Sequence, residues 1–392
     1  MKFWQLLMVG CGLALAASPA SAEKASVIRI GIINTTSGPI AALAEEQIRG
    51  IELAIQQLGG KIGGVPVEVY KEDGRYTPDT GLQAVTKLVE RDKVDFLLGN
   101  QMSNEVLAYA KPAADPGVFV LSGLAGPSAL AGAQCNPRLF VLSWENNTPS
   151  EAVGELMTEA GIKRGYFIGQ NYVTGREHVA GAKRFFKGDI VGEAYVPIEH
   201  MDFAAELAAV QAANPDGMYV FLPGASGIAF VKQFVNSGVK DKVKLFSGSW
   251  LADETNFTAL GDAALGINEA ANWFADLDNP DNRKFVEAFR KEYGRRPVFY
   301  AAFQYDAVML LNQVVAQRGG DISDKKALQA ALEHAQVHSV RGTFAFNGNH
   351  FPIQDFYSAE VVKSAGMLRH KTVSTVFHDH KDQFYQSCHM PE

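Results

Sequence analysis

The chain runs SVIRIGIIN over residues 26–34, AALAEEQIRGIELAIQQLGG over 41–60 and VPVEVYKED over 65–73. The first segment is rich in β-branched residues, the second places its apolar residues at helical spacing and stops at two glycines, and the third alternates like a strand. These patterns predict a strand, a helix and a second strand. Repeated strand–helix–strand units build a parallel α/β sheet.

The alternation of strands and helices continues and then repeats. A first series extends through VDFLLG (94–99) and GVFVLSG (117–123), and a second of similar length runs from RGYFIGQ (164–170) to KVKLFSGSW (242–250). A helix-rich block over 282–335 follows, and no low-complexity linker separates the two series. Since one core rarely supports a chain of this length, we predict an α/β protein with two Rossmann-like lobes, each a parallel sheet flanked by helices.

The first 22 residues have the features of a secretory signal peptide. They contain Lys2, the apolar stretch LLMVGCGLALAA and the small residues Ala20-Ser21-Ala22, so we predict cleavage after Ala22 and a periplasmic mature protein. Lipidation at Cys11 is an alternative, although Met8-Val9-Gly10 fits a lipoprotein site poorly. No later window has the ~18 apolar residues of a membrane helix.

Charge and cysteine content limit the partners and suggest a cross-link. The net charge of −7 is spread without long runs, which argues against nucleic acid or an anionic membrane as a partner. Two cysteines follow the signal peptide, Cys135 and Cys388. An even number in an oxidising compartment favours a disulfide between them, and two inert buried thiols are the alternative.

The segment FLLGNQMSNEVLAYA (96–110) combines a strand, a short loop and the start of a helix. In a doubly wound sheet, ligands bind beyond the carboxyl ends of the strands, where helix N-termini present free N–H groups. We expect Ser103 to be the N-cap of this helix, and its hydroxyl and the helix amides favour an anion. Capping alone is the other interpretation of Ser103.

Four segments together resemble the leucine/isoleucine/valine-binding protein family of periplasmic receptors for ABC importers. They are IRIGIINTTSGPIAALAEEQIRGIELAIQQLGGKIGG (28–64), FLLGNQMSN (96–104), FVLSGLAGPSAL (119–130) and YAAFQYDAVMLL (300–311). The resemblance implies the type I periplasmic binding fold, a monomer whose lobes are joined by three crossings and close on a small solute, and an inner-membrane permease as partner. The implied lobes are 23–143 plus 274–349 and 144–273 plus 350–392.

The resemblance also implies where the ligand binds. Members of this family place a serine on the ligand's carboxylate where Ser103 stands, and the loop GLAG (123–126) completes the anion site. The glutamate that usually accepts an amino acid's ammonium group is replaced by Ser249 and Trp250. Thr174 stands where a tyrosine is expected. Burying an ammonium group without an anionic or carbonyl partner is unfavourable, so an α-amino acid fits poorly.

Aromatic residues at the pocket loops favour an aromatic carboxylate of the benzoate, hydroxybenzoate or phenylpropenoid type. The segments YFIGQNYVTGREHVAGAKRFFKG (166–188) and CHMP (388–391) are similar to the branch of the family that takes up lignin-derived aromatic acids. The expected ligand contacts are Gln101, Ser103, Leu124, Ala125, Gly126, Tyr172, Thr174, Pro223, Ser249, Trp250 and Tyr300.

The sequence contains no motif of a common enzyme class. It lacks a G-x-S-x-G elbow, a P-loop and a G-x-G-x-x-G turn, and the pair His334 and His338 lacks the glutamate of a hydrolytic zinc motif. We therefore expect no enzymatic activity, no cofactor and no metal. Two other functions stay open: a receptor for a branched-chain amino acid or small amide, and the ligand-sensing ectodomain of a signalling receptor. We prefer transport because no membrane segment precedes the end of the sequence at CHMPE.

Overall fold

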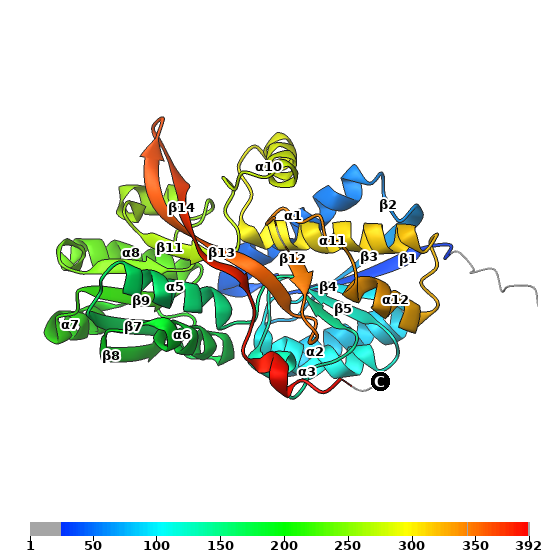
Figure 1. Ribbon diagram of the computed structural model, residues 1–392, viewed down its shortest axis with the longest axis horizontal. Coiled ribbons are helices and arrows are strands. Elements are labelled where there is room, and N and C mark those ends of the chain that lie inside the picture. Colours follow the sequence, from blue (N-terminus) through cyan, green and yellow to red (C-terminus); the bar gives the residue numbers. More distant parts are fainter. Residues whose placement is uncertain (1–24, 343, 391–392) are drawn as a thin grey trace, which may run out of the picture.

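The computed structural model describes residues 25–342 and 344–390. The predicted signal peptide, its cleavage site and Cys11 lie outside the described residues. Figure 1 shows two α/β bodies side by side, with β1 and β3–β5 in one and β7–β9 in the other. The predicted fold class, two parallel-sheet lobes flanked by helices, is confirmed.

The first lobe is built on a six-stranded sheet in the order β2-β3-β1-β4-β5-β6. All neighbours pair in parallel except β2 and β3, which form an antiparallel hairpin. The strands are β1 (Ile28–Asn34), β2 (Lys61–Ile62), β3 (Val65–Asp73), β4 (Phe96–Gly99), β5 (Phe119–Ser122) and β6 (Leu139–Val141).

Both faces of this sheet are covered by helices, because alternate strand residues point to opposite sides. One face packs on α1, α11 and α12, and the other on α2 and α3. Gly50 lets α1 approach α11 closely, since a Cβ there would lie 2.2 Å from the Ala301 carbonyl oxygen. The helices of this lobe are α1 (Ala41–Gln57), α2 (Pro78–Thr86), α3 (Ser103–Ala114), α4 (Ser128–Ala131), α11 (Phe299–Gln317) and α12 (Lys325–Glu333).

The second sheet, which is the centre of the second lobe, has eight strands: β12-β13-β11-β10-β9-β7-β8 form a continuous order and β14 pairs with β13. Its strands are β7 (Arg164–Gln170), β8 (Asp189–Val196), β9 (Gly217–Phe221), β10 (Lys244–Ser247), β11 (Asn268–Ala271), β12 (Phe344–Phe346), β13 (Pro352–Ser364) and β14 (Met367–His380). The helices along this part of the chain are α5 (Thr148–Glu159), α6 (Val173–Phe185), α7 (Ala204–Ala213), α8 (Ala225–Asn236), α9 (Phe257–Leu260) and α10 (Pro280–Tyr293).

The second sheet is parallel only in its central part. Strands β7 to β11 pair in parallel, whereas β13 pairs antiparallel with β11, β12 and β14. The orange and red hairpin β13–β14 runs across the molecule in Figure 1. Helix α12 ends at Glu333, so His334 and His338 do not share a helix face, although their spacing of four positions is that of a zinc-binding pair on a helix.

Three crossings connect the lobes, and a cluster of polar side chains joins them at the hinge. The Ser143 carbonyl, just after β6, accepts hydrogen bonds from Asn272 Nδ2 at 2.9 Å and from Gln354 Nε2 at 2.7 Å. Asn272 follows β11 and Gln354 lies near the start of β13. Buried Arg341 donates to the carbonyl of Leu142 and to Gln354 Oε1, so the hinge is a compact polar cluster.

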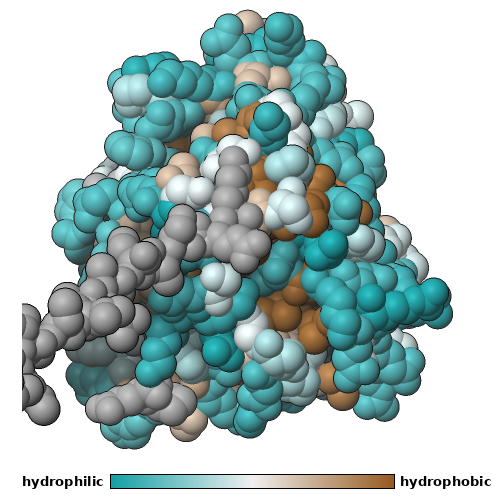
Figure 2. Space-filling model, turned by 90° about the vertical axis from the view of Figure 1, so that its right-hand side faces the viewer, coloured by the Kyte–Doolittle hydropathy of each residue, from teal (hydrophilic) through white to brown (hydrophobic). Residues whose placement is uncertain are grey.

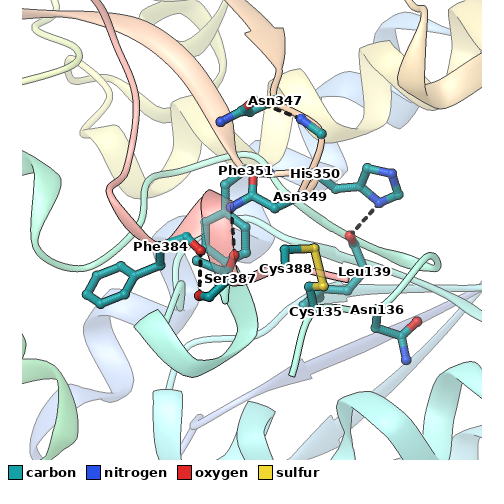
Figure 3. Close-up of a disulfide and its surroundings, with 12 residues drawn as sticks. Cys135, Asn136, Leu139, Asn347, Asn349, His350, Phe351, Phe384, Ser387 and Cys388 are labelled. Carbon is teal, nitrogen blue, oxygen red and sulfur yellow. Dashed lines mark hydrogen bonds between the residues drawn. A yellow bond between two sulfur atoms is a disulfide. The ribbon is translucent and has the colours of Figure 1, made fainter. Parts of the chain in front are cut away.

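A disulfide ties the C-terminal tail to the first lobe. Cys135 and Cys388 are bonded across 253 positions, which confirms the predicted pairing. Figure 3 shows the bridge beside Asn349 and Ser387, and the short 3-10 helix Phe384–Ser387 lies against α4. Asn349 donates to the Ala131 carbonyl and to Asp382, so the tail is held by hydrogen bonds as well.

The surface of the first-lobe end is mostly hydrophilic, with hydrophobic residues gathered in small hollows (Figure 2). Within residues 25–342 and 344–390, no helix combines the length and apolarity needed to cross a membrane.

Candidate functional site

A cavity lies between the two lobes, beyond the carboxyl ends of their parallel strands. Its volume is about 60 Å³, measured as the space that the centres of water molecules can reach. First-lobe loops and helix starts form one wall, and second-lobe loops form the other. The lining residues are Ile40, Leu43, Gln101, Met102, Ser103, Leu124, Ala125, Trp144, Asn146, Gln170, Tyr172, Thr174, His178, Ile198, Phe221, Pro223, Trp250, Phe299 and Tyr300.

Ser103 sits at a polar corner of this cavity, at the start of α3. Its hydroxyl oxygen accepts hydrogen bonds from Thr174 Oγ1 at 2.9 Å and from Asn146 Nδ2 at 3.1 Å. Since a hydroxyl has one hydrogen and two lone pairs, these two donors occupy both lone pairs. The hydroxyl hydrogen of Ser103 is left to donate to a group in the cavity.

Ser103 does not cap α3, which corrects the expectation from the sequence. The helix begins at Ser103 itself, its N-cap residue is Met102, and no side chain caps it. The Ser103 hydroxyl therefore bonds to neighbouring side chains in place of the backbone amides of its own helix.

The GLAG loop contributes fewer free amides than the sequence suggested. The N–H of Gly123 donates to the Gly99 carbonyl, that of Ala125 to the Asn100 carbonyl and that of Gly126 to Asn146 Oδ1. These three amides hold β4, β5 and the first crossing together, so they are not free to bind a ligand. Within the described chain, the Leu124 amide is the one of this loop without a protein acceptor.

Asn146 and Glu177 join the lobes beside Ser103. Glu177, on α6, accepts from Asn146 Nδ2 at 2.7 Å through one oxygen. Its other oxygen accepts from the Ser128 amide at 3.0 Å and from the Ser128 hydroxyl, at the start of α4. A second-lobe carboxylate thus binds the first lobe directly, and the described conformation has the lobes in contact.

The opposite part of the cavity is aromatic. Trp250 packs edge-on against Phe221 with ring centroids 5.0 Å apart, and Trp144 contacts Trp250 at 6.4 Å and Phe299 at 5.4 Å. The Trp250 ring folds over Gly248, where a Cβ would lie 2.2 Å from the indole. A glycine at position 248 is therefore required for this orientation of the indole.

His178 lies in the same aromatic wall, and a row of buried, hydrogen-bonded side chains lies behind it. Its ring stacks on Phe221 at 4.1 Å and meets Trp250 edge-on at 4.6 Å. Nδ1 is 2.6 Å from Ser150 Oγ, which is 2.7 Å from the hydroxyl of Tyr219. Burial lowers the pKa of His178 well below its usual value, so the imidazole is neutral.

The structure brings most of the predicted site residues together. Those on the cavity wall are Gln101, Ser103, Leu124, Ala125, Tyr172, Thr174, Pro223, Trp250 and Tyr300. The Gln101 amide is already engaged, since it accepts from Thr35 N and donates to the Ile40 carbonyl. Gln101 therefore positions the loop before α1 and leaves little of its amide for a ligand.

Gly126 and Ser249 do not line the cavity. A Cβ at Gly126 would lie 1.9 Å from the Trp144 carbonyl oxygen, so this glycine serves the close approach of the first crossing. Ser249 lines a separate small cavity with Asp253 and His370, because Trp250 turns into the main cavity from the same loop.

The charge of the cavity wall is small. Among the described residues that line it, none is aspartate, glutamate, lysine or arginine. Burial raises the pKa of Tyr172 and of Tyr300 above the usual value, so both phenols are neutral donors. The described part of the chain contains no group of three or more His, Cys, Asp or Glu side chains arranged to hold a metal ion.

Several lining residues were not found from the sequence, chiefly Trp144, Asn146, His178, Phe221 and Phe299. A signal for His178 was present: it lies four positions after Thr174 on one helix, and residues four apart share a helix face. Trp144 and Asn146 gave no such signal because they belong to a crossing without periodicity.

Comparisons with known proteins agree with this architecture. The profile of a family described as periplasmic binding protein matches residues 27–366. The Leu/Ile/Val-binding protein homolog 6 of Brucella melitensis biotype 1 is 27% identical over 374 residues, covering 93% of this chain and 95% of that protein.

Two similar crystal structures contain aromatic acids. A solute-binding protein of an ABC transporter from R. palustris, in complex with benzoate, is 30% identical with a TM-score of 0.87, covering 92% of this chain and 99% of that chain. A solute-binding protein from Rhodopseudomonas palustris BisB5, in complex with 3,4-dihydroxybenzoic acid, is 29% identical with a TM-score of 0.86 and the same coverage.

Proposed function

Because the chain belongs to the periplasmic binding protein family and is a solute-binding protein of an ABC transporter, we propose that its ligand is a small aromatic carboxylate of the benzoate type. The family implies a periplasmic location, and such proteins bind small molecules and work with a membrane permease. In this proposal, the protein acts as a monomer, delivers the acid to an inner-membrane permease and catalyses no reaction.

The observation that carries the proposal is the composition of the cavity wall. It combines aromatic rings with neutral donors, and no acidic side chain among the described lining residues could accept an ammonium group. An α-amino acid would bury its ammonium group there without an anionic partner, at a cost of several kcal/mol. A benzoate-type acid carries no cation and leaves no such group unpaired.

We place the ligand's carboxylate at Ser103. The free hydrogen of the Ser103 hydroxyl and the Leu124 amide both suit an anion, and the N-terminus of α3 contributes a partial positive charge. Hydrogen bonds to a charged acceptor are stronger than those between neutral groups, so neutral donors suffice in this corner.

We place the ring against Trp144, Phe221 and Trp250. Offset and edge-to-face ring contacts add about 0.5–1.5 kcal/mol beyond area burial. The benzoate and 3,4-dihydroxybenzoic acid bound by the two similar proteins support this class of ligand. The predicted contacts kept in the proposal are Ser103, Leu124, Ala125, Tyr172, Thr174, Pro223, Trp250 and Tyr300.

The second candidate is a branched-chain amino acid, which the name of the Brucella relative favours. Isothermal titration calorimetry of the mature protein, freed of co-purified ligand by unfolding and refolding, decides between them. We expect benzoate and 4-hydroxybenzoate to bind and leucine to give no heat. Binding of leucine without binding of either aromatic acid would refute the proposal.

A further inference from the structure

The row formed by Tyr219, Ser150 and His178 fixes which nitrogen of the imidazole carries its hydrogen. Tyr219 is fully buried, and within the described chain the partner of its hydroxyl is Ser150 Oγ at 2.7 Å. If Ser150 donated to Tyr219, the phenolic hydrogen would be buried without an acceptor. Buried donors are almost always satisfied, so Tyr219 donates to Ser150.

The direction of that first bond sets the next one. Ser150 has a single hydroxyl hydrogen, and His178 Nδ1 lies 2.6 Å from its oxygen. With Tyr219 donating to it, Ser150 donates to Nδ1, which must then be the unprotonated nitrogen. The neutral ring carries its one hydrogen on Nε2.

Nε2–H of His178 has no partner in the described part of the chain, and His178 lines the cavity. Its ring is also fixed in place, stacked on Phe221 and edge-on to Trp250. The aromatic wall therefore holds one rigid N–H donor. A bare benzene ring would cover it without offering an acceptor, whereas an oxygen substituent would accept from it.

We propose that His178 is a specificity-determining residue whose Nε2–H donates to an oxygen on the ligand's ring, so that hydroxy- and methoxybenzoates are preferred over benzoate. This inference rests on the proposed function, because it assumes that the ring of an aromatic acid lies against the aromatic wall. It explains why a histidine, with a buried polar chain behind it, stands among Phe221, Trp144 and Trp250.

The test compares ligands that differ at one non-hydrogen atom, a hydroxyl oxygen in place of a methyl carbon. Calorimetry with 3- and 4-hydroxybenzoate and the corresponding methylbenzoates should show a preference of about tenfold for at least one hydroxyl over the methyl group of similar size. In His178→Phe, which keeps a ring on Phe221 and removes the N–H, that ratio should fall to about one. His200→Phe replaces a histidine outside the cavity and should keep the ratio.

A second measurement needs no variant of His178. Nitrogen NMR of the ¹⁵N-histidine-labelled protein should show the Nε2–H tautomer at neutral pH, with an Nε2 shift on adding the preferred hydroxybenzoate. Tyr219→Phe removes the donor that sets the direction of the hydrogen bonds from Tyr219 through Ser150 to His178. This variant should also populate the tautomer with the hydrogen on Nδ1.

The outcomes separate this inference from the proposed function. If benzoate, hydroxybenzoates and methylbenzoates all bind with the same affinity, the aromatic-acid function stands and the role of His178 is refuted. An Nδ1–H tautomer, or a hydroxyl preference unchanged in His178→Phe, refutes it as well. If no aromatic acid binds to the wild-type protein, both proposals fail.

Discussion

The hydroxyl groups of Ser103 and Thr174 meet across the cleft at 2.9 Å, although the residues are 71 positions apart in the chain. Ser103 belongs to the first lobe and Thr174 to the second, so this bond exists only when the lobes are close. Thr174 also occupies one acceptor position of Ser103 and leaves the Ser103 hydroxyl hydrogen free to donate into the cavity. If the ligand's carboxylate binds at Ser103 as we propose, lobe contact and anion binding are coupled through one hydroxyl group.

Replacing Ser103 with alanine should weaken the binding of benzoate-type acids. The variant removes a donor to a charged acceptor, worth about 1.5–3 kcal/mol, so the dissociation constant should rise about ten- to a hundredfold. Because Ser103 does not cap its helix, the melting temperature should change little. Ser226→Ala, at the start of α8 and outside the cavity, is the matched control and should bind normally. A stable Ser103→Ala protein with unaltered affinity would contradict this assignment.

The contact of Glu177 with Ser128 and Asn146 should hold the lobes together around a bound ligand. Glu177→Gln keeps the shape but replaces one of two accepting oxygens with a donor. We expect the ligand to dissociate several-fold faster, with a smaller change in the association rate. Stopped-flow fluorescence of the cavity tryptophans measures both rates. Glu193→Gln, in a surface ion pair of the same lobe, should leave both rates unchanged. Rates in Glu177→Gln equal to those of the wild type would show that the contact of Glu177 with Ser128 and Asn146 does not hold the lobes together.

The sequence predicted the parallel core of both lobes because most of its buried strands are short apolar runs followed by a segment with helical periodicity. Residues 28–34 and 41–57 are clear examples. The antiparallel extension of the second sheet was not predicted. Strands β13 and β14 carry mixed polar and apolar residues, since much of the hairpin is exposed, and Met367 near its turn is 63% exposed. The proposed division of the lobes at 143, 274 and 349 stays a prediction.

The candidate site was predicted where it follows directly from a strand end. Ser103 and Trp250 each stand a few residues after a buried strand, so topology alone places them at the cleft. The capping role of Ser103 was wrong because Asn146 and Thr174, both distant in sequence, compete for its oxygen. Such side-chain networks depend on tertiary placement and leave no periodic signal in the sequence.

Removal of the disulfide should lower stability without abolishing binding. Cys135 and Cys388 close a loop of 253 positions, for which chain entropy gives a limit of about 5 kcal/mol, and measured values are commonly about 2–4 kcal/mol. Urea unfolding of the double variant Cys135→Ala, Cys388→Ala should show this loss, and calorimetry should show similar affinity because neither residue lines the cavity. Two thiols that react in the unfolded, unreduced wild-type protein would show that the bond does not form.

Stability should fall as pH rises toward neutrality because of Glu105. Burial raises the pKa of this carboxyl to about 7 from an ordinary value of 4.5, so the folded protein favours the protonated form. The stabilisation is complete below about pH 4.5 and is lost as pH rises through 7. Burial also raises the pKa of Asp253, to about 6, so part of the loss between pH 5 and 8 belongs to other carboxyls. We expect the loss to be smaller by about 1–3 kcal/mol in Glu105→Gln than in the wild type, and unchanged in Glu159→Gln, an exposed control. Urea unfolding of the three proteins at both pH values is the measurement.

Trp250→Leu should discriminate between an aromatic and a merely apolar role of the indole. The indole contacts Phe221 and His178 and lines the cavity, so its loss removes ring contacts as well as buried area. Ring contacts add about 0.5–1.5 kcal/mol, so benzoate should lose about two- to tenfold more affinity than cyclohexanecarboxylate, which has a similar size and no aromatic ring.

Trp273→Leu is the matched control. This buried tryptophan donates to Asn282 away from the cavity, and its loss should cost stability while leaving both affinities unchanged. Equal losses for the two acids in Trp250→Leu would mean that the indole only fills space, and the aromatic assignment would lose its support from this wall.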